Sequence, residues 1–167
     1  GWQMNDEALR LLDRLPLRFA SDTRGREPFL PVLDGRVLHC PQLPTTLPTL
    51  DELLGRDDLA HPDVISHVFA QTRVSTRSGH VYTLHAELEG MALAPLFERL
   101  LQGWKAEGFS AGALADSFAQ LDTEHLPHCA IERGSVDGRS GLLAVQGVAQ
   151  NVYHSAAAPA ATGVHRS

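Results

Sequence analysis

The chain has little of the material from which disulfide scaffolds and zinc sites are built. Its 167 residues include only two cysteines, Cys40 and Cys129, which share no CxxC motif and no cluster with histidines. A structural zinc site needs four clustered ligands, so none is expected. Two isolated thiols favour a reducing compartment, and a single long-range disulfide between them is the alternative.

Long apolar runs and an excess of positive charge are also missing. No segment approaches the roughly 18 apolar residues of a membrane-spanning helix, and the first residues lack the pattern of a signal peptide. Fourteen Lys and Arg against 20 Asp and Glu leave a net charge of −6. A protein that binds nucleic acid normally carries a clustered basic excess, so no nucleic-acid partner is expected.

Common catalytic motifs are absent as well. The chain has no P-loop, no GxGxxG after a strand-like segment and no GxSxG motif. Nine histidines are present, but none forms an HxxxH or HExxH pair. Histidines without such spacing are more often solvated or part of a core than metal ligands.

The chain does contain enough apolar material for one ordinary domain. Its hydrophobic fraction is 43% and its charged fraction 20%, which together exclude general disorder. We expect residues 1–150 to form a single domain. The Ala-rich segment 151–167 has no periodicity, so we expect it to be a mobile tail.

Helical signals occur at five places. Asn5 can cap a helix over 5–15, which Pro16 ends. Thr49 and Glu52 form a capping box for a short helix. The other three helices are expected from Pro62 onward, over 93–107 and, more weakly, over 111–121.

Strand signals are fewer than helical ones. The expected strands are 17–20, 36–41, 80–85 and two runs within 128–147, whereas the Pro-rich segment 26–36 has the composition of a loop. Strands that alternate with amphipathic helices predict an α/β fold with a parallel sheet or barrel. A closed barrel needs about eight strands, and too few are evident here.

His85 is the leading candidate for catalysis because it ends the strongest predicted strand. In parallel α/β folds the loops that leave the carboxyl ends of strands build the active site. Glu87 and Glu89 follow at alternate positions, where they could orient the imidazole or raise its pKa. The alternative is a strand-end histidine that is bonded to backbone, with both glutamates solvated.

Asp22 occupies a similar place, where a predicted strand opens into a loop that also contains Arg24 and Arg26. With His85 it could form an acid–base pair at one edge of the sheet. The alternative is an Asx-turn carboxylate beside two surface arginines.

Several blocks of the chain resemble one family. They are Ser21–Gly25 (SDTRG), Pro28-Phe29, Leu43–Asp57 (LPTTLPTLDELLGRD), Val81–Gly90 (VYTLHAELEG) and Gly138–Gly141 (GRSG). In this order they resemble the polysaccharide-deacetylase superfamily. The branch concerned is the one that deformylates 4-deoxy-4-formamido-L-arabinose on undecaprenyl phosphate, a step of lipid A modification linked to polymyxin resistance.

The resemblance implies a fold and a reaction. The fold is a distorted (β/α) barrel, of which this chain would supply only the C-terminal strands and helices. The reaction is hydrolysis of an amide at a divalent metal, with an N-terminal aspartate as base. His85 falls on the family's general acid and Asp22 on its fourth motif, which supports the catalytic groups. Trp2 falls on the third motif, and Trp2, Arg24, Glu87 and Glu89 would contact substrate.

Two departures from the family pattern bear on function. Gln3 stands where the family has an arginine that pairs with the fourth-motif aspartate, and Arg24 or Arg26 is the candidate substitute. The two motifs that hold the metal ligands do not occur in the chain. We therefore expect it to contribute the general-acid half of the site without metal ligands and to be inactive alone.

The resemblance also implies partners and a location. The open side of a half barrel would pair with the N-terminal half or self-associate. The substrate would be the undecaprenyl-phosphate-linked aminoarabinose derivative, met by peripheral contact with the membrane at the cytoplasmic face of the bacterial inner membrane. A non-catalytic module that binds a sugar phosphate or a partner chain is the alternative, and a purely structural interaction domain is a third possibility.

Overall fold

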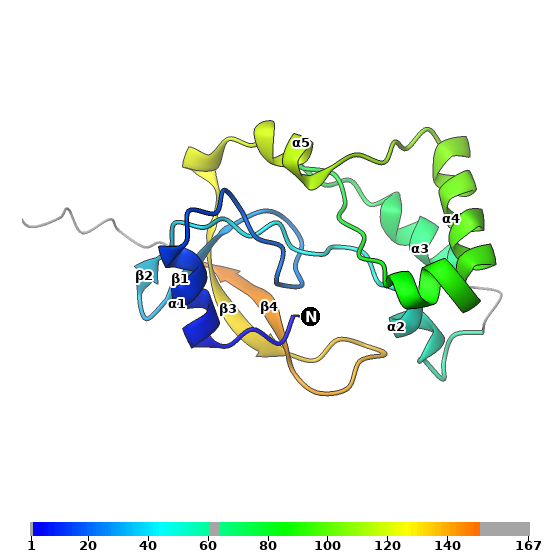
Figure 1. The fold of residues 1–167 in the computed structure, drawn as a ribbon, viewed down its shortest axis with the longest axis horizontal. Coiled ribbons are helices and arrows are strands. Elements are labelled where there is room, and N and C mark those ends of the chain that lie inside the picture. Colours follow the sequence, from blue (N-terminus) through cyan, green and yellow to red (C-terminus); the bar gives the residue numbers. More distant parts are fainter. Residues whose placement is uncertain (1, 61–63, 151–167) are drawn as a thin grey trace, which may run out of the picture.

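The computed structural model describes residues 2–60 and 64–150, and its regular structure lies in a mixed sheet and two groups of helices (Figure 1). The strands are β1 (Leu30–Leu33), β2 (Arg36–Val37), β3 (His128–Gly134) and β4 (Leu143–Ala149). Their order in the sheet is β2-β1-β3-β4. Only the central pair, β1 with β3, is parallel.

The helices lie on both sides of a set of extended segments. They are α1 (Asp6–Arg14), α2 (Leu50–Leu54), α3 (Val64–Thr72), the π-helix η2 (Leu88–Ala92), α4 (Ala94–Ala106), α5 (Leu114–Ala119) and the 3-10 helix η3 (Thr123–His125). Figure 1 shows α1 beside the sheet, and α2, α3 and α4 together at the other end of the molecule. The α/β class is thereby confirmed, whereas a distorted barrel is not.

Local helix signals were accurate. The Asn5 side chain accepts the backbone N–H of Ala8 at 2.8 Å, as an N-cap should. The Glu52 carboxylate accepts the backbone N–H of Thr49 at 3.0 Å, which completes the capping box. The predicted helices at 93–107 and 111–121 are confirmed as α4 and α5. Gly1, the Pro62 helix start and the 151–167 tail lie outside the described residues.

The strand predictions were less accurate. Segment 17–20 forms only an isolated bridge at Ala20, and 36–41 shortens to β2. The predicted loop 26–36 contains β1, whose Pro31 pairs in register with Cys129 of β3. The two runs within 128–147 are confirmed as β3 and β4.

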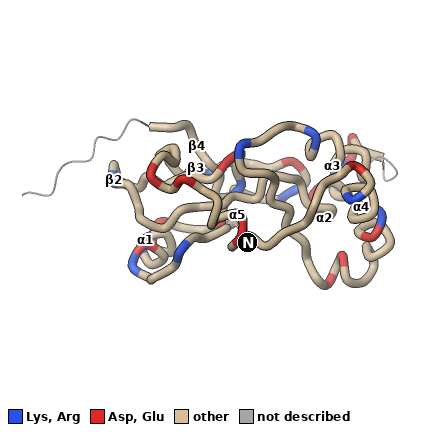
Figure 2. Tube along the Cα trace, turned by 90° about the horizontal axis from the view of Figure 1, so that it is seen from above, with Lys and Arg blue, Asp and Glu red and all other residues tan. Residues whose placement is uncertain are grey.

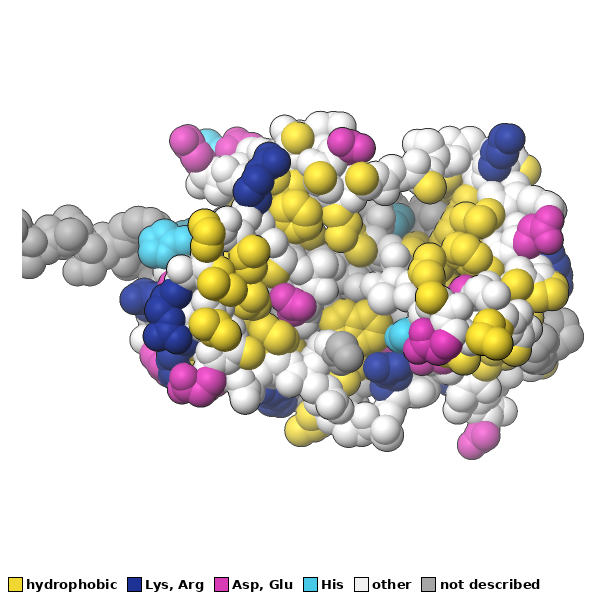
Figure 3. All heavy atoms as spheres, viewed as in Figure 1, with side chains coloured by type: hydrophobic (Ala, Val, Ile, Leu, Met, Phe, Trp, Pro, Cys, Tyr) yellow, Lys and Arg dark blue, Asp and Glu magenta, His cyan; other side chains and the backbone are white. Residues whose placement is uncertain are grey.

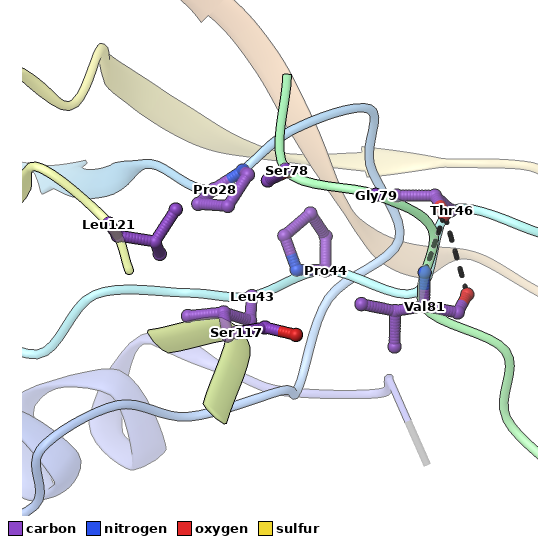
Figure 4. A pocket seen from close by; sticks show the side chains of 9 residues that line it. All are labelled: Pro28, Leu43, Pro44, Thr46, Ser78, Gly79, Val81, Ser117 and Leu121. Carbon is purple, nitrogen blue, oxygen red and sulfur yellow. Dashed lines mark hydrogen bonds between the residues drawn. The ribbon is translucent and has the colours of Figure 1, made fainter. Parts of the chain in front are cut away.

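The segment 80–85, the strongest strand prediction, belongs to no strand, so that prediction is wrong. Only Val81 forms backbone bonds of the sheet kind there: its carbonyl accepts the N–H groups of Thr46 and Leu47, and its N–H donates to the Thr46 hydroxyl. Figure 4 shows the Thr46 hydroxyl bonded to the N–H and carbonyl groups of Val81, at the lining of a small cavity of about 10 Å³, close to the space of one water molecule. A periodic pattern predicted a strand but could not supply a neighbouring one.

Hydrophobic packing is divided between the two ends of the molecule. The helical end has a core of six fully or almost fully buried residues, Leu50, Leu53, Val64, Ile65, Val68 and Leu100. The sheet end buries Phe29, Leu43 and Leu143. Figure 3 shows hydrophobic side chains gathered over both ends on the same face, with more polar surface between them.

Both cysteines are buried free thiols rather than a disulfide. Cys40 is 5% exposed and Cys129 is 2% exposed. Burial raises the pKa of each thiol, and nearby carboxylates raise that of Cys40 further. The reduced alternative of the sequence analysis is the one observed.

Because the thiolate is the reactive species, we expect iodoacetamide at pH 8 to label Cys40 and Cys129 at least about tenfold more slowly in the native protein than in urea. Mass spectrometry of the two tryptic peptides measures each rate separately. Rapid labelling of either peptide in the native state would contradict the burial described here.

Candidate active site

His85 lies where the segment 80–85 leads into a helical turn. Its carbonyl accepts the N–H groups of Leu88 and Glu89, and its own N–H donates to the Glu89 carboxylate at 2.8 Å. Glu89 is 2% exposed, and its other oxygen accepts the Tyr82 hydroxyl at 3.2 Å. Burial, followed by the charge of Glu89, raises the pKa of Tyr82, so this phenol stays protonated. Glu89 therefore fixes the backbone that presents His85.

The imidazole of His85 faces the carboxylate of Asp51. Nδ1 lies 3.5 Å from Asp51 Oδ1, too far for a hydrogen bond, and this buried nitrogen has no other bonding partner within the described residues. The His85 side chain is 27% exposed, so its exposed surface belongs to the other ring atoms. Catalytic hydrogen bonds are often long before substrate binds. The ring is thus placed with Nδ1 inward and its remaining edge accessible.

Asp51 is held by two further groups. Its Oδ1 accepts the Thr49 hydroxyl at 2.5 Å and its Oδ2 accepts Arg139 Nη1 at 2.8 Å. Burial alone would raise the pKa of Asp51. The Thr49 hydrogen bond and the charges of His85 and Arg139 outweigh burial and lower that pKa, so the carboxylate is ionised beside the imidazole.

Behind this pair, Trp2 lies between two guanidinium groups. The Arg24 carbon Cζ is 5.0 Å from the centre of the indole ring, and that of Arg139 is 5.3 Å from it. Trp2 is 6% exposed, and its carbonyl accepts the Ala144 N–H of β4. The indole therefore connects the sheet to the arginine that holds Asp51.

Arg24 is engaged with internal partners. It donates to the Leu47 carbonyl at 2.8 Å and to Glu52 at 3.2 Å, and its side chain is 11% exposed. Burial lowers the pKa of Arg24, and the Glu52 charge opposes that effect. Arg24 does not pair with Asp22, so the substitution suggested for the missing family arginine is not observed.

Glycine is required at one point of this arrangement. Gly138 has φ +80°, and a Cβ atom there would overlap the carbonyl oxygen of Glu52. The loop before β4 can approach α2 so closely only with glycine at this position. The close approach brings Arg139 to Asp51.

Asp22 stands apart from this group. Its carboxylate makes no hydrogen bond or ion pair with any residue in 2–60 or 64–150, and its backbone N–H donates to Gln42 at 3.0 Å. Partial burial raises its pKa. Within the same ranges, no hydrogen bond or ion pair joins Asp22 to His85. The exposed side chain of Glu87 likewise forms no hydrogen bond or ion pair with residues of these ranges.

Two residues of the site were missed by the sequence reasoning. Asp51 and Arg139 both lie inside the blocks that carry the family resemblance, but Asp51 was considered only as part of a helix start. The two are 88 positions apart in the sequence. Their location in those shared blocks was the available signal.

The described side chains do not fit a divalent metal. Over 2–60 and 64–150, no three His, Cys, Asp or Glu residues gather closely enough to hold an ion. Asp51, the nearest carboxylate to His85, is already occupied by Thr49 and Arg139. The described residues around His85 can therefore hold and move a proton, but they do not form a metal site.

This α/β chain, with a partly exposed histidine beside an ionised carboxylate, is similar to two curated proteins named as probable deformylases. One is a probable 4-deoxy-4-formamido-L-arabinose-phosphoundecaprenol deformylase of Shewanella sediminis, 34% identical over 156 residues, which cover 93% of this chain and 49% of that protein. Another, also named as a probable deformylase of this kind, comes from Wigglesworthia glossinidia brevipalpis. It is 32% identical over 87% of this chain and 50% of its own length.

These similarities confirm the resemblance to this deformylase that was drawn from the sequence. The chain spans about half the length of the curated relatives it matches. Family models give no match. Among the helices of the described residues, none combines the length and the apolar character needed to cross a membrane.

Proposed function

We propose that this chain is part of a hydrolase that removes the formyl group from 4-deoxy-4-formamido-L-arabinose carried on undecaprenyl phosphate. The observation that carries the proposal is the 34% identity to a probable deformylase of this substrate across 93% of the chain. The His85–Asp51 pair supports it, because amide hydrolysis needs a group that protonates the leaving nitrogen.

In the proposed reaction, water adds through its oxygen to the formyl carbon and loses one proton to solvent, the C–N bond breaks, and formate and a free sugar amine result. His85, as imidazolium, gives the proton from its accessible edge to the departing nitrogen. Asp51 faces Nδ1 and stabilises the charged ring until the proton leaves. A proton from solvent then restores the imidazolium.

The other predicted site residues take supporting roles in this proposal. Glu87 is exposed, and we assign it contact with the sugar. Glu89 holds the His85 backbone, and Trp2 with Arg24 supports Arg139 from behind. Asp22 is half-buried and has a raised pKa, and we assign it to the support of catalytic groups that lie outside the described residues.

The same proposal covers the cofactor and the partner. The divalent metal implied by the family resemblance would take its ligands from outside the described residues, since these offer no cluster for one. The natural partner is the rest of a protein about twice this length, as in the relatives, and self-association is the alternative. Exposed Leu142 and Met91, 58% and 71% accessible, are candidates for that contact. The reaction would occur at the cytoplasmic face of the inner membrane.

Incubation of the intact gene product with the formamido-arabinose lipid tests the proposal. We expect release of formate and appearance of a primary amine, both measurable by mass spectrometry. A matched incubation with the N-acetyl analogue controls for general amidase activity. Binding of the lipid without release of formate would refute the hydrolase and support the non-catalytic module.

A further inference from the structure

A groove separate from the His85 site lies between the loop after Arg24 and the loop after α3. Its volume is about 400 Å³, and among its lining residues are Arg26, Glu27, Arg77 and His80. None of His85, Asp51 and Arg139 lines it. This space is ample for a phosphate group with part of the molecule that bears it.

The groove carries unbalanced positive charge in an acidic protein. Within the described residues six of the twelve arginines form ion pairs with carboxylates, and Arg26 and Arg77 belong to the six that form none. Both are exposed, and Glu27 is the single acidic residue of the lining. Elsewhere basic and acidic residues are interspersed along the chain (Figure 2). The groove is thus a local cationic site despite the net charge of −6.

The walls of the groove are fixed before any ligand binds. The N–H groups of Arg26 and Glu27 donate to Gln146 Oε1 of β4 at 2.7 and 3.3 Å. Opposite them, His80 Nε2 lies 2.8 Å from the Val74 carbonyl, an acceptor, so Nε2 carries a proton. Its Nδ1 lies 3.2 Å from the Thr46 hydroxyl. A ligand therefore meets Arg26 on a backbone that is bonded to β4, and Arg77 on the loop between Val74 and His80.

We infer that this groove binds the phosphate diester of an anionic lipid headgroup. Guanidinium groups match phosphate oxygens in geometry and charge. Val74 lines the same groove and is 58% exposed, which places an apolar side chain beside the arginines, as suits a lipid surface better than a free anion. Because it uses none of the residues around His85, this inference is independent of the proposed hydrolysis.

Cosedimentation of the intact gene product with phosphatidylcholine vesicles, with and without phosphatidylglycerol, tests the inference. Each arginine near an anionic surface contributes roughly a fivefold increase in partitioning. Arg26→Gln with Arg77→Gln should therefore lower binding to the anionic vesicles about 25-fold. Glu27→Gln should raise it, since the lining loses its carboxylate.

A charge-matched control distinguishes an effect of the groove on vesicle binding from an effect of the protein's net charge. Arg99→Gln with Lys105→Gln removes the same two charges from exposed positions of α4 and should change binding much less. Equal losses in both double variants would overturn the inference, as would vesicle binding that is independent of phosphatidylglycerol. Displacement by millimolar inorganic phosphate alone would show a free-anion site and also refute the lipid assignment. Release of formate from a water-soluble substrate should stay unchanged in every variant.

Discussion

Replacing His85 by glutamine is expected to lower kcat/KM for formate release by about a hundred- to ten-thousandfold in the intact protein. That range is the usual contribution of a general acid or base. Glutamine keeps the polar bulk near Asp51 but cannot give up a proton, so folding should persist while leaving-group protonation is lost. Steady-state measurement of formate over a range of substrate concentrations gives kcat and KM separately.

A matched control is available elsewhere in the chain. His125 lies 2.7 Å from Asp122 in an exposed ion pair, and its side chain is 80% accessible. His125→Gln should leave kcat/KM within about twofold of the unsubstituted protein, because the site does not include it. Comparable losses in both variants would remove the special role assigned to His85.

Asp51 extends the same prediction, as a positioning residue. Asp51→Asn removes the negative charge that faces Nδ1 and pairs with Arg139, so kcat should fall by up to about a hundredfold with KM little changed. Asp51→Glu should recover part of that loss. A rise in KM with unchanged kcat would instead make Asp51 a substrate-binding residue.

Interactions between residues close in the sequence could be predicted, whereas interactions between distant residues could not. The Asn5 cap and the Thr49–Glu52 box involve residues three positions apart, so pattern alone identified both helix starts. β1 was missed because Pro31 gave its segment the composition of a loop. The place of β1 in the sheet depends on β3, which lies almost 100 residues later. Strand identity is a property of the partner as much as of the segment.

The same distinction applies to the residues of the site. His85 could be proposed from its position in one segment, but its neighbour Asp51 lies 34 positions earlier and Arg139 lies 88 positions after Asp51. Arg24 shows the reverse error. It was placed with Asp22 because the two are close in sequence, whereas the fold pairs it with Glu52 on α2. Proximity in the sequence suggested one partner, whereas the fold supplies Glu52 and the Leu47 carbonyl instead.

Glu52 gives the largest expected effect on stability. Its side chain is 1% exposed, one carboxylate oxygen receives Arg24 and the Thr49 N–H, and the other has no partner within the described residues. Arg24→Met keeps the apolar stem but leaves this buried carboxylate without its cation. We expect the free energy of unfolding, measured with urea, to fall by about 3–5 kcal/mol.

A second substitution shows where that loss comes from. Adding Glu52→Gln to Arg24→Met removes the uncompensated charge while the amide oxygen can still accept the Thr49 N–H, so most of the lost stability should return. Arg56→Met is the control, because its partner Asp58 is 70% exposed and such pairs contribute at most about 1 kcal/mol. If Arg24→Met lowers the free energy of unfolding no more than Arg56→Met does, Glu52 is not a buried charge. The ion pair of Arg24 with Glu52 would then not explain how α2 is held to Trp2 and Arg139.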